Sequence, residues 1–385
     1  MTPPQNVQLP VTSQDPRRGV LIALLAAALP LCGVLHANAS ESGAAAARVL
    51  NNAPPRPRLA PPAAPEPRAI RLPNASNLLF AKKELRVPPH VRLMVFAPHP
   101  DDETLGAGGL IQRVLASGGT VQIVFVTNGD GYVDGVRVES RRTDARASDF
   151  IQYGQRRHDE ALRAVQDIGL RASDAVFLGF PDDGIDDLWA AHWSENRPYV
   201  SPYTRFARPP YKDSLSPQVD YAGSELEEEI TRTLRAFRPT WVVLPDPRDR
   251  HPDHCTTGVF VLDALRALRQ EPGDWFDRTQ AFTYLVHYPD YPASAAWIKE
   301  IVGAGVGGSL TAGRVLTAAP WLSLPLTPAE LAGKQRAIAA YQTQVQVMKP
   351  FLAQFVRGFE LFAQLDATQV ATVPRKYAAR FRRPK

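Results

Sequence analysis

The fold of this chain is decided by residues 91–106, which read Val91-Arg92-Leu93-Met94-Val95-Phe96-Ala97-Pro98-His99-Pro100-Asp101-Asp102-Glu103-Thr104-Leu105-Gly106. The first half is an apolar run that predicts a buried strand, and a helical pattern follows over about residues 104–115. His99, Asp101 and Asp102 therefore lie on the turn between a strand and a helix. Open α/β sheets bind ligands at the carboxyl ends of their strands, which makes this turn a candidate site.

A second stretch repeats the arrangement. Residues 241–245 form another apolar strand-like run, residues 246–254 form a polar turn, and a helical pattern follows over about residues 256–269. Strands of one parallel sheet can end at the same edge, so His251 or His254 can reach the first turn. Histidine and aspartate are both zinc ligands, and a catalytic zinc needs only three protein ligands beside water.

Each polar turn alone also has a plainer interpretation. Acidic residues before a helix serve as an N-cap and favour the helix dipole, and His251-Pro252-Asp253-His254 by itself fits a surface turn. Two such turns at matching positions after two predicted strands favour a functional site.

The two turns carry a family resemblance. Residues 97–106 together with His251-Pro252-Asp253-His254 resemble the PIG-L/LmbE-like family of zinc-dependent N-acetylglucosaminyl deacetylases. The resemblance covers roughly residues 90–290 and extends weakly to residues 334–344. It implies an α/β fold, with a Rossmann-like, open, mostly parallel sheet and helices on both faces. It also implies hydrolysis of an N-acetyl group, usually on an amino sugar.

The resemblance further implies a role for each polar side chain. His99, Asp102 and His254 would hold zinc or another divalent ion, Asp101 would act as general base, and His251 would stabilise the developing oxyanion. The residue types independently permit these roles, because carboxylates and histidines serve both as metal ligands and as proton-transfer groups.

Arg157 and Asp182, which lie outside the two turns, are predicted to contact the substrate. Arg157 and Glu160 match the Arg-x-x-Glu pattern of the family, in which the arginine is implied to approach the substrate. A helix-surface ion pair is the alternative. Asp182 follows the third predicted strand, over residues 175–178, and is expected to bind a sugar hydroxyl.

A long aromatic connection spans residues 185–222. Trp189 and Trp193 are its predicted sugar-binding side chains, because aromatic faces suit the apolar faces of sugar rings. Packing of the loop on itself, with the aromatics as a small satellite core, is the alternative. Prolines in this stretch argue against long helices. The remaining elements predicted are strands over 121–127 and 281–287, a helix that opens at residue 156, and helices over 225–237 and 334–345.

The first 39 residues have the pattern of a signal peptide. Arg17 and Arg18 precede an uncharged stretch over residues 19–35, and Ala37-Asn38-Ala39 offers small residues for cleavage. An uncleaved membrane anchor is the alternative, although the stretch is shorter than the roughly 20 residues of a typical spanning helix. We therefore expect an exported protein, periplasmic or extracellular, or else one attached to a membrane through this segment.

The rest of the chain divides into three parts. Residues 40–84 are rich in alanine and proline and predict an extended linker. The deacetylase-like domain is expected over residues 85–375, with a basic tail at 376–385. Much of the positive charge behind the formal net charge of +5 lies at the two ends of the chain. Since no nucleic-acid-binding motif accompanies it, we expect a solvated surface and no nucleic-acid partner, with an acidic polymer or a membrane face as the alternative.

These features predict a zinc-dependent N-deacetylase whose partner is an N-acetylated sugar or glycoconjugate. The alternative is a catalytically silent carbohydrate-binding relative, but a protein that only binds has no need of the base Asp101. The chain lacks the His-Glu-x-x-His of many zinc peptidases and the Gly-x-Gly-x-x-Gly of dinucleotide enzymes at its first turn. The acetylated substrate and the oligomeric state stay open.

We predict that the mature protein begins near Ser40, because residues 1–39 carry the charge, apolar stretch and cleavage residues of a signal. N-terminal sequencing of protein from a host with bacterial export machinery measures this. An intact Met1 in the membrane fraction would show the anchor instead.

Overall fold

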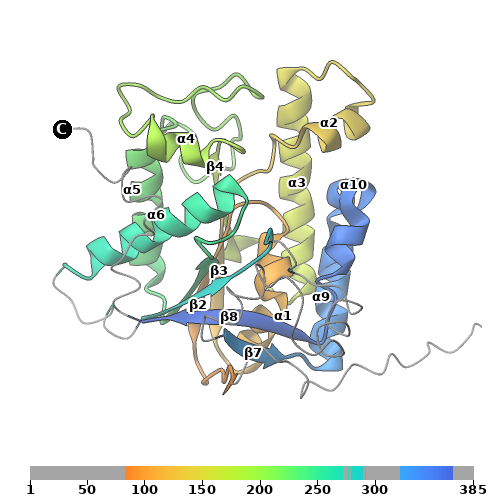
Figure 1. Cartoon of the computed structure of the whole chain (residues 1–385), viewed down its shortest axis with the longest axis vertical. Helices are drawn as coiled ribbons and strands as arrows, with labels where there is room; N and C mark the ends of the chain where they lie inside the picture. Colours follow the sequence, from red (N-terminus) through yellow and green to blue (C-terminus); the bar gives the residue numbers. More distant parts are fainter. Residues whose placement is uncertain (1–82, 272–275, 277–278, 289–290, 292–320, 367–385) are drawn as a thin grey trace, which may run out of the picture. The chain divides into compact units, whose positions relative to one another are not determined.

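An eight-stranded sheet organises the residues described by the computed structural model, which are 83–271, 276, 279–288, 291 and 321–366 (Figure 1). The strand order is β1-β7-β8-β6-β5-β2-β3-β4. Neighbours are parallel, except that β8 runs antiparallel to β6 and β7. The predicted open, mostly parallel sheet is thus confirmed. The strands are β1 (Lys83–Glu84), β2 (Arg92–Ala97), β3 (Thr120–Thr127), β4 (Ala175–Phe180), β5 (Trp241–Pro245), β6 (Gln280–Tyr284), β7 (Trp321–Pro325) and β8 (Phe359–Leu365).

The strand β2 lies inside the sheet, between β5 and β3. All its residues except Arg92 are buried, because helices cover both faces, and strands buried on both faces carry continuous apolar runs. Its pairing with β5 places Leu93 opposite Trp241 and Val95 opposite Val243. The two predicted strand ends therefore open onto the same edge of the sheet.

Helices cover both faces of the sheet, as Figure 1 shows and as the sequence predicts. One hydrophobic core joins the sheet to α1, α3, α9 and α10, and a second core joins the opposite face to α4, α5 and α6. The helices are α1 (Asp102–Ala116), α2 (Val133–Ser140), α3 (Ala147–Asp167), α4 (Ile185–Ala190), α5 (Gly223–Phe237), α6 (Pro252–Leu268), α9 (Pro328–Ala340) and α10 (Gln342–Ala353).

The first turn of α1 packs closely on the sheet because residue 106 is glycine. A Cβ atom at Gly106 would lie 2.2 Å from the ring of Tyr284 on β6. The Tyr284 hydroxyl in turn donates to the carbonyl oxygen of Phe96 at 2.9 Å. This close approach holds the polar turn before α1 against the carboxyl ends of β2 and β6.

Two helices begin earlier than the sequence patterns predict. α3 begins at Ala147 rather than near residue 156, because the Asp149 carboxylate accepts a hydrogen bond from the Arg146 N–H (2.8 Å) and caps the first turn. α6 begins at Pro252 rather than near residue 256, since proline suits the first position of a helix. His254 consequently lies in the first turn of α6 instead of on the preceding loop.

The predicted late helix over residues 334–345 is two helices, α9 and α10, which meet at Tyr341. Tyr341 has φ −78° and ψ 63°, outside the helical range. Its fully buried hydroxyl donates to Glu103 Oε1 at 2.5 Å. The break turns the chain so that this hydroxyl reaches the start of α1.

Several predicted segments fall outside the described residues. These are the signal or anchor at 1–39, the linker at 40–84 except its last two residues, and the basic tail at 376–385. The last two linker residues form β1, which pairs with β7, so the sheet begins two residues before the expected domain start. Among the described helices, none combines the length and apolar character needed to cross a membrane.

A buried ion pair joins α9, β8 and α1. Lys334 Nζ lies 2.7 Å from Glu360 Oε1 and donates to the Leu105 carbonyl at 2.9 Å. The Glu360 carboxylate also accepts the N–H groups of Gly109 and Leu110 at 2.7 and 2.9 Å. Both charged side chains are almost fully buried, so each depends on the other for compensation of its charge.

We predict that Lys334→Met lowers the free energy of unfolding by about 3–5 kcal/mol, because it leaves Glu360 buried and uncompensated. Urea denaturation of the purified variant measures this. Lys349→Met is the matched control, since Lys349 is exposed on α10, and it should change stability by less than about 0.5 kcal/mol. Equal stability of the two variants would refute the importance of the pair.

Candidate active site

The two polar turns meet at the carboxyl edge of the sheet, as the sequence predicts. The first turn leaves β2, and Asp101 is the N-cap of α1. The second leaves β5, and His251 is the N-cap of α6. The parallel pairing of β2 with β5 places the two turns side by side.

Three predicted ligand atoms form a nearly equilateral triangle. His99 Nδ1 lies 3.2 Å from Asp102 Oδ2, His254 Nε2 lies 3.1 Å from the same oxygen, and the two histidine nitrogens are 3.2 Å apart. A tetrahedral zinc with bonds of about 2.0–2.1 Å separates its ligand atoms by about 3.3 Å. The three side chains therefore have the spacing that a tetrahedral ion requires.

The charge around this triangle also suits a cation. Five aspartates around His99 and His254 are at most 6% exposed, and Arg157 is the basic side chain beside them in the described structure. Buried carboxylates are costly unless they are paired or coordinate a metal. Burial lowers the pKa of His254, but Asp102 and Asp249 outweigh it and raise the pKa to about 9. The same negative field favours a divalent cation at His254 Nε2. The aspartates are Asp101, Asp102, Asp182, Asp249 and Asp253.

Second carboxylates orient both histidines. Asp182 Oδ1 lies 3.0 Å from His99 Nε2, and Asp253 Oδ2 lies 3.4 Å from the same nitrogen. Asp249 Oδ2 lies 3.6 Å from His254 Nδ1. A carboxylate on the far nitrogen of a ligating histidine sets its tautomer and orientation. Asp249 has no role predicted from the sequence, although its place between β5 and His251 is a signal for such a role.

Asp182, predicted to bind a sugar hydroxyl, contacts other protein groups through both of its carboxylate oxygens. Its Oδ2 accepts the Gly131 N–H at 2.6 Å while Oδ1 contacts His99. Burial opposes ionisation, but His99 and Arg157 outweigh it and hold the pKa of Asp182 well below its usual range. Asp182 lines the pocket as a charged group whose two oxygens are both engaged.

Asp101 is held in a strained backbone conformation beside the triangle. Its φ of 126° lies in the region that favours glycine. Its N–H donates to Glu103 Oε2 at 3.1 Å, and its carboxylate faces the pocket. Burial and the neighbouring Asp102 raise the pKa of Asp101 to about 8, against the effect of Arg157. A carboxyl group in this setting can exchange a proton near neutral pH.

Arg157 lies beneath Asp101 rather than on a helix surface. It is 4% exposed, and its guanidinium donates to the carbonyls of Gly129 and Pro100 at 2.9 and 2.7 Å. One guanidinium nitrogen lies 3.6 Å from Asp101 Oδ2. Glu160 accepts hydrogen bonds from Thr343 instead of pairing with Arg157. The surface ion-pair alternative is therefore wrong, and Arg157 borders the pocket.

His251 presents one ring nitrogen to the pocket. Its Nδ1 accepts the N–H of Asp253 at 3.3 Å, so the ring proton of the neutral form lies on Nε2. Burial and the charges of His99 and His254 lower the pKa of His251 to about 3, which keeps the ring neutral. His251 is thus a hydrogen-bond donor next to His99, with ring centroids 4.9 Å apart.

Trp189 lies in the hydrophobic core, the half-buried Trp193 packs against that core, and neither lines the pocket. Trp189 is 4% exposed, and its ring contacts Trp193 and Phe260 edge to face at 5.2 and 4.8 Å between centroids. Trp193 stacks on Phe260 at 6.0 Å. The predicted sugar platform is corrected, because α4 forms within the 185–222 connection and both rings pack on Phe260 of α6. The two tryptophans join the second main core and do not form a satellite core of the loop on itself.

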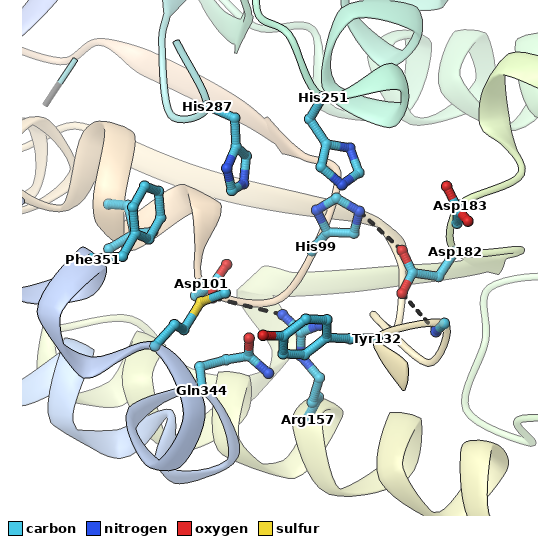
Figure 2. Close-up of a pocket in the computed structure, with 13 residues that line it drawn as sticks. His99, Asp101, Tyr132, Arg157, Asp182, Asp183, His251, His287, Gln344 and Phe351 are labelled. Atoms are coloured by element: carbon cyan, nitrogen blue, oxygen red, sulfur yellow. Dashed lines mark hydrogen bonds and ion pairs between the residues drawn. The ribbon is translucent and has the colours of Figure 1, made fainter. Parts of the chain in front are cut away.

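The side chains of the two polar turns border a pocket of about 280 Å³. Figure 2 shows His99 and His251 in its middle, Asp182 and Asp183 on one side, and Phe351 on the other. His287 also lines it. The lining consists of His99, Asp101, Leu105, Gly131, Tyr132, Arg157, Asp182, Asp183, His251, His287, Gln344, Met348 and Phe351.

Comparison with known proteins adds a family match. Residues 94–265 match the family described as PIG-L, GlcNAc-PI de-N-acetylase. A 1D-myo-inositol 2-acetamido-2-deoxy-alpha-D-glucopyranoside deacetylase of Kribbella flavida is 26% identical over 280 residues, which are 69% of this chain and 86% of the relative. A diacetylchitobiose deacetylase of Thermococcus kodakarensis is 26% identical over 177 residues, 45% and 49% of the two chains. The solved N,N'-diacetylchitobiose deacetylase from Pyrococcus horikoshii shares 19% identity, with a TM-score of 0.43 over 71% of this chain and 83% of that one.

We predict that the purified protein binds a divalent ion at the triangle and that His99→Ala and His254→Ala each abolish stoichiometric binding. Metal analysis after gel filtration measures this. His192→Ala is the control, since His192 lies on the connection after α4 and bonds to Arg197. Asp182→Asn should keep the ion with an affinity about 10- to 100-fold lower, because it leaves the three ligands in place and weakens the contact that orients His99. Full metal content in both alanine variants would place the ion elsewhere.

Proposed function

Because the chain belongs to the PIG-L/LmbE-like family of N-acetylglucosaminyl deacetylases, we propose that it is a metal-dependent hydrolase that removes the N-acetyl group of an amino sugar or glycosylated metabolite. The observation that carries this proposal is the triangle of His99, Asp102 and His254 with Asp101 beside it in one pocket. The proposed metal ligands, the proposed base and a pocket for the substrate thus lie together.

The ligand triangle supplies the place where the amide is activated. Zinc or a similar divalent ion held there by His99, Asp102 and His254 would polarise the amide carbonyl and lower the pKa of a bound water. Asp182 and Asp253 keep the His99 ring in position, and Asp249 lies beside His254.

Asp101 is the proposed proton carrier of the reaction. Its carboxylate accepts the proton of the attacking water and returns it to the nitrogen of the leaving amine. Arg157, 3.6 Å away, and the Glu103 hydrogen bond to the Asp101 N–H hold this carboxylate at the pocket wall. The chain therefore supplies both the general base and the general acid from one side chain.

His251 is the proposed donor to the developing oxyanion. With Nδ1 engaged by the Asp253 N–H, the Nε2–H of the neutral ring remains for the substrate. A donor fixed in place in a buried site stabilises charge that develops in the transition state.

A sugar ring fits the polar side of the pocket. Asp183 and Tyr132 line this side, and the Tyr203 hydroxyl holds the Asp183 carboxylate at 2.7 Å. Fixed carboxylates and hydroxyls are suited to bind the hydroxyl groups of a sugar. The N-terminal signal predicted from the sequence further leads us to propose an exported enzyme that meets its N-acetylated sugar or glycoconjugate outside the cytoplasm.

We predict that Asp101→Asn lowers kcat for acetate release about 100- to 10,000-fold while metal content stays unchanged, since the ligands are untouched. Asparagine tolerates the positive φ of this position as aspartate does, so the fold should persist. Acetate release from a panel of N-acetylated sugars measures activity.

Asp159→Asn is the matched control, because Asp159 lies on α3 with a side chain 54% exposed, and its activity should equal that of the wild type. Near-normal turnover of Asp101→Asn would refute its role. Sugar binding without acetate release by the wild type, tested on the whole panel, would favour the catalytically silent carbohydrate-binding relative.

A further inference from the structure

The pocket has an apolar end that the proposed chemistry does not use. Leu105, Met348 and Phe351 line it. Leu105 is buried, whereas Met348 and Phe351 are only half-buried and pack against the hydrophobic core from the pocket side. The apolar end therefore offers contact surface to a bound group.

The opposite end is polar, and its charged groups are fixed. Asp182 is held by Gly131 and His99, and Asp183 by the Tyr203 hydroxyl. In Figure 2 these two aspartates lie across the histidines from Phe351. A substrate with one polar and one apolar substituent can bind between the two ends in a single orientation.

Phe351 is a fixed wall of the apolar end. Its ring stacks on His287 with centroids 5.1 Å apart and an interplanar angle of 6°. On another side it contacts the ring of Phe355 at 5.4 Å and 70°, and Phe355 is 2% exposed. A ring held from two directions sets a firm limit to the space in front of it.

A kink in α10 brings this wall to the site. Met348 has φ −133° and ψ 26°, outside the helical range, and Pro350 lies inside the helix, where proline removes a hydrogen bond and clashes with the preceding turn. Met348 and Phe351 also lie beyond residues 94–265, the part that matches the family. The kink at Met348 and Pro350 therefore sets the shape of this end of the pocket.

We propose that the apolar end binds the acyl group of the substrate and that Phe351 limits the length of that group. The inference rests on the proposed function: the amide carbonyl at the metal triangle carries a sugar nitrogen on one side and an alkyl group on the other. The sugar matches the polar end, so the alkyl group faces Leu105, Met348 and Phe351. The enzyme thus favours acetyl over longer acyl groups because Phe351 closes the space.

The test compares glucosamine derivatives that carry N-acetyl, N-butyryl or N-hexanoyl groups, with release of the free amine measured. In Phe351→Ala, the ratio of kcat/KM for hexanoyl to that for acetyl should rise at least about tenfold over the wild type, since each methylene that gains apolar contact contributes about fourfold. Phe206→Ala should leave the ratio unchanged, because Phe206 is 48% exposed on the aromatic connection.

Thermal unfolding shows whether Phe351→Ala is folded. If it is not, the single variants Phe351→Leu and Met348→Ala each enlarge the apolar end by less. An unchanged acyl profile in a folded variant would overturn the proposal. A variant that instead gains activity on the octyl glycoside of N-acetylglucosamine would also overturn it, because the apolar end would then bind the aglycone.

Binding of the free carboxylates separates this inference from the proposed function. Calorimetry with acetate and hexanoate should show hexanoate binding at least about tenfold tighter in Phe351→Ala than in the wild type, and acetate binding little changed. This result would support binding of the acyl group at the apolar end even if no substrate of the panel were cleaved. Absence of cleavage would refute only the proposed deacetylase function. Equal hexanoate affinity in both proteins would overturn the inference.

Discussion

Parallel pairing of β2 with β5 is the constraint on which the candidate site depends. The pairing sets the register of Leu93 against Trp241 and Val95 against Val243, and both strands are buried between helices. Each strand is followed in the chain by a polar turn and a helix. Because the strands point the same way, the turns open at one edge, and residues about 150 positions apart in sequence come within hydrogen-bond distance.

The negative charge gathered at this edge explains many surrounding contacts. Buried carboxylates need donors or cations, and backbone N–H groups of the neighbouring loops supply part of these donors. Asp253 accepts the N–H groups of Asp183 and Ile185, and Asp249 accepts those of Val286 and His287. These bonds tie the loops after β4, β5 and β6 together. The carboxylates that favour a cation therefore also hold the loops that form the pocket.

The C-terminal part of the described chain completes the site from behind. Lys334 and Glu360 join α9 and β8 to α1, and the Tyr341 hydroxyl reaches Glu103, which bonds to the Asp101 N–H. The break at Tyr341 that makes this contact also redirects α10 toward the pocket. Residues far from both polar turns in sequence thus support the strained Asp101 and form the apolar wall. The polar turn before α1 and the apolar end of the pocket therefore belong to one packed unit.

The sequence by itself determined the two strand-turn-helix units and the polar side chains between them. Apolar runs and helical periodicity are local signals, and a strand buried on both faces shows them plainly. Tertiary structure alone decided which side chains face one another. Asp249 lies beside His254, Arg157 lies beneath Asp101, and the Trp189 ring lies in the core. Each of these positions depends on which helices and strands pack together. Phe351 reached the pocket only through the kink of α10, a consequence of packing that no local pattern carries.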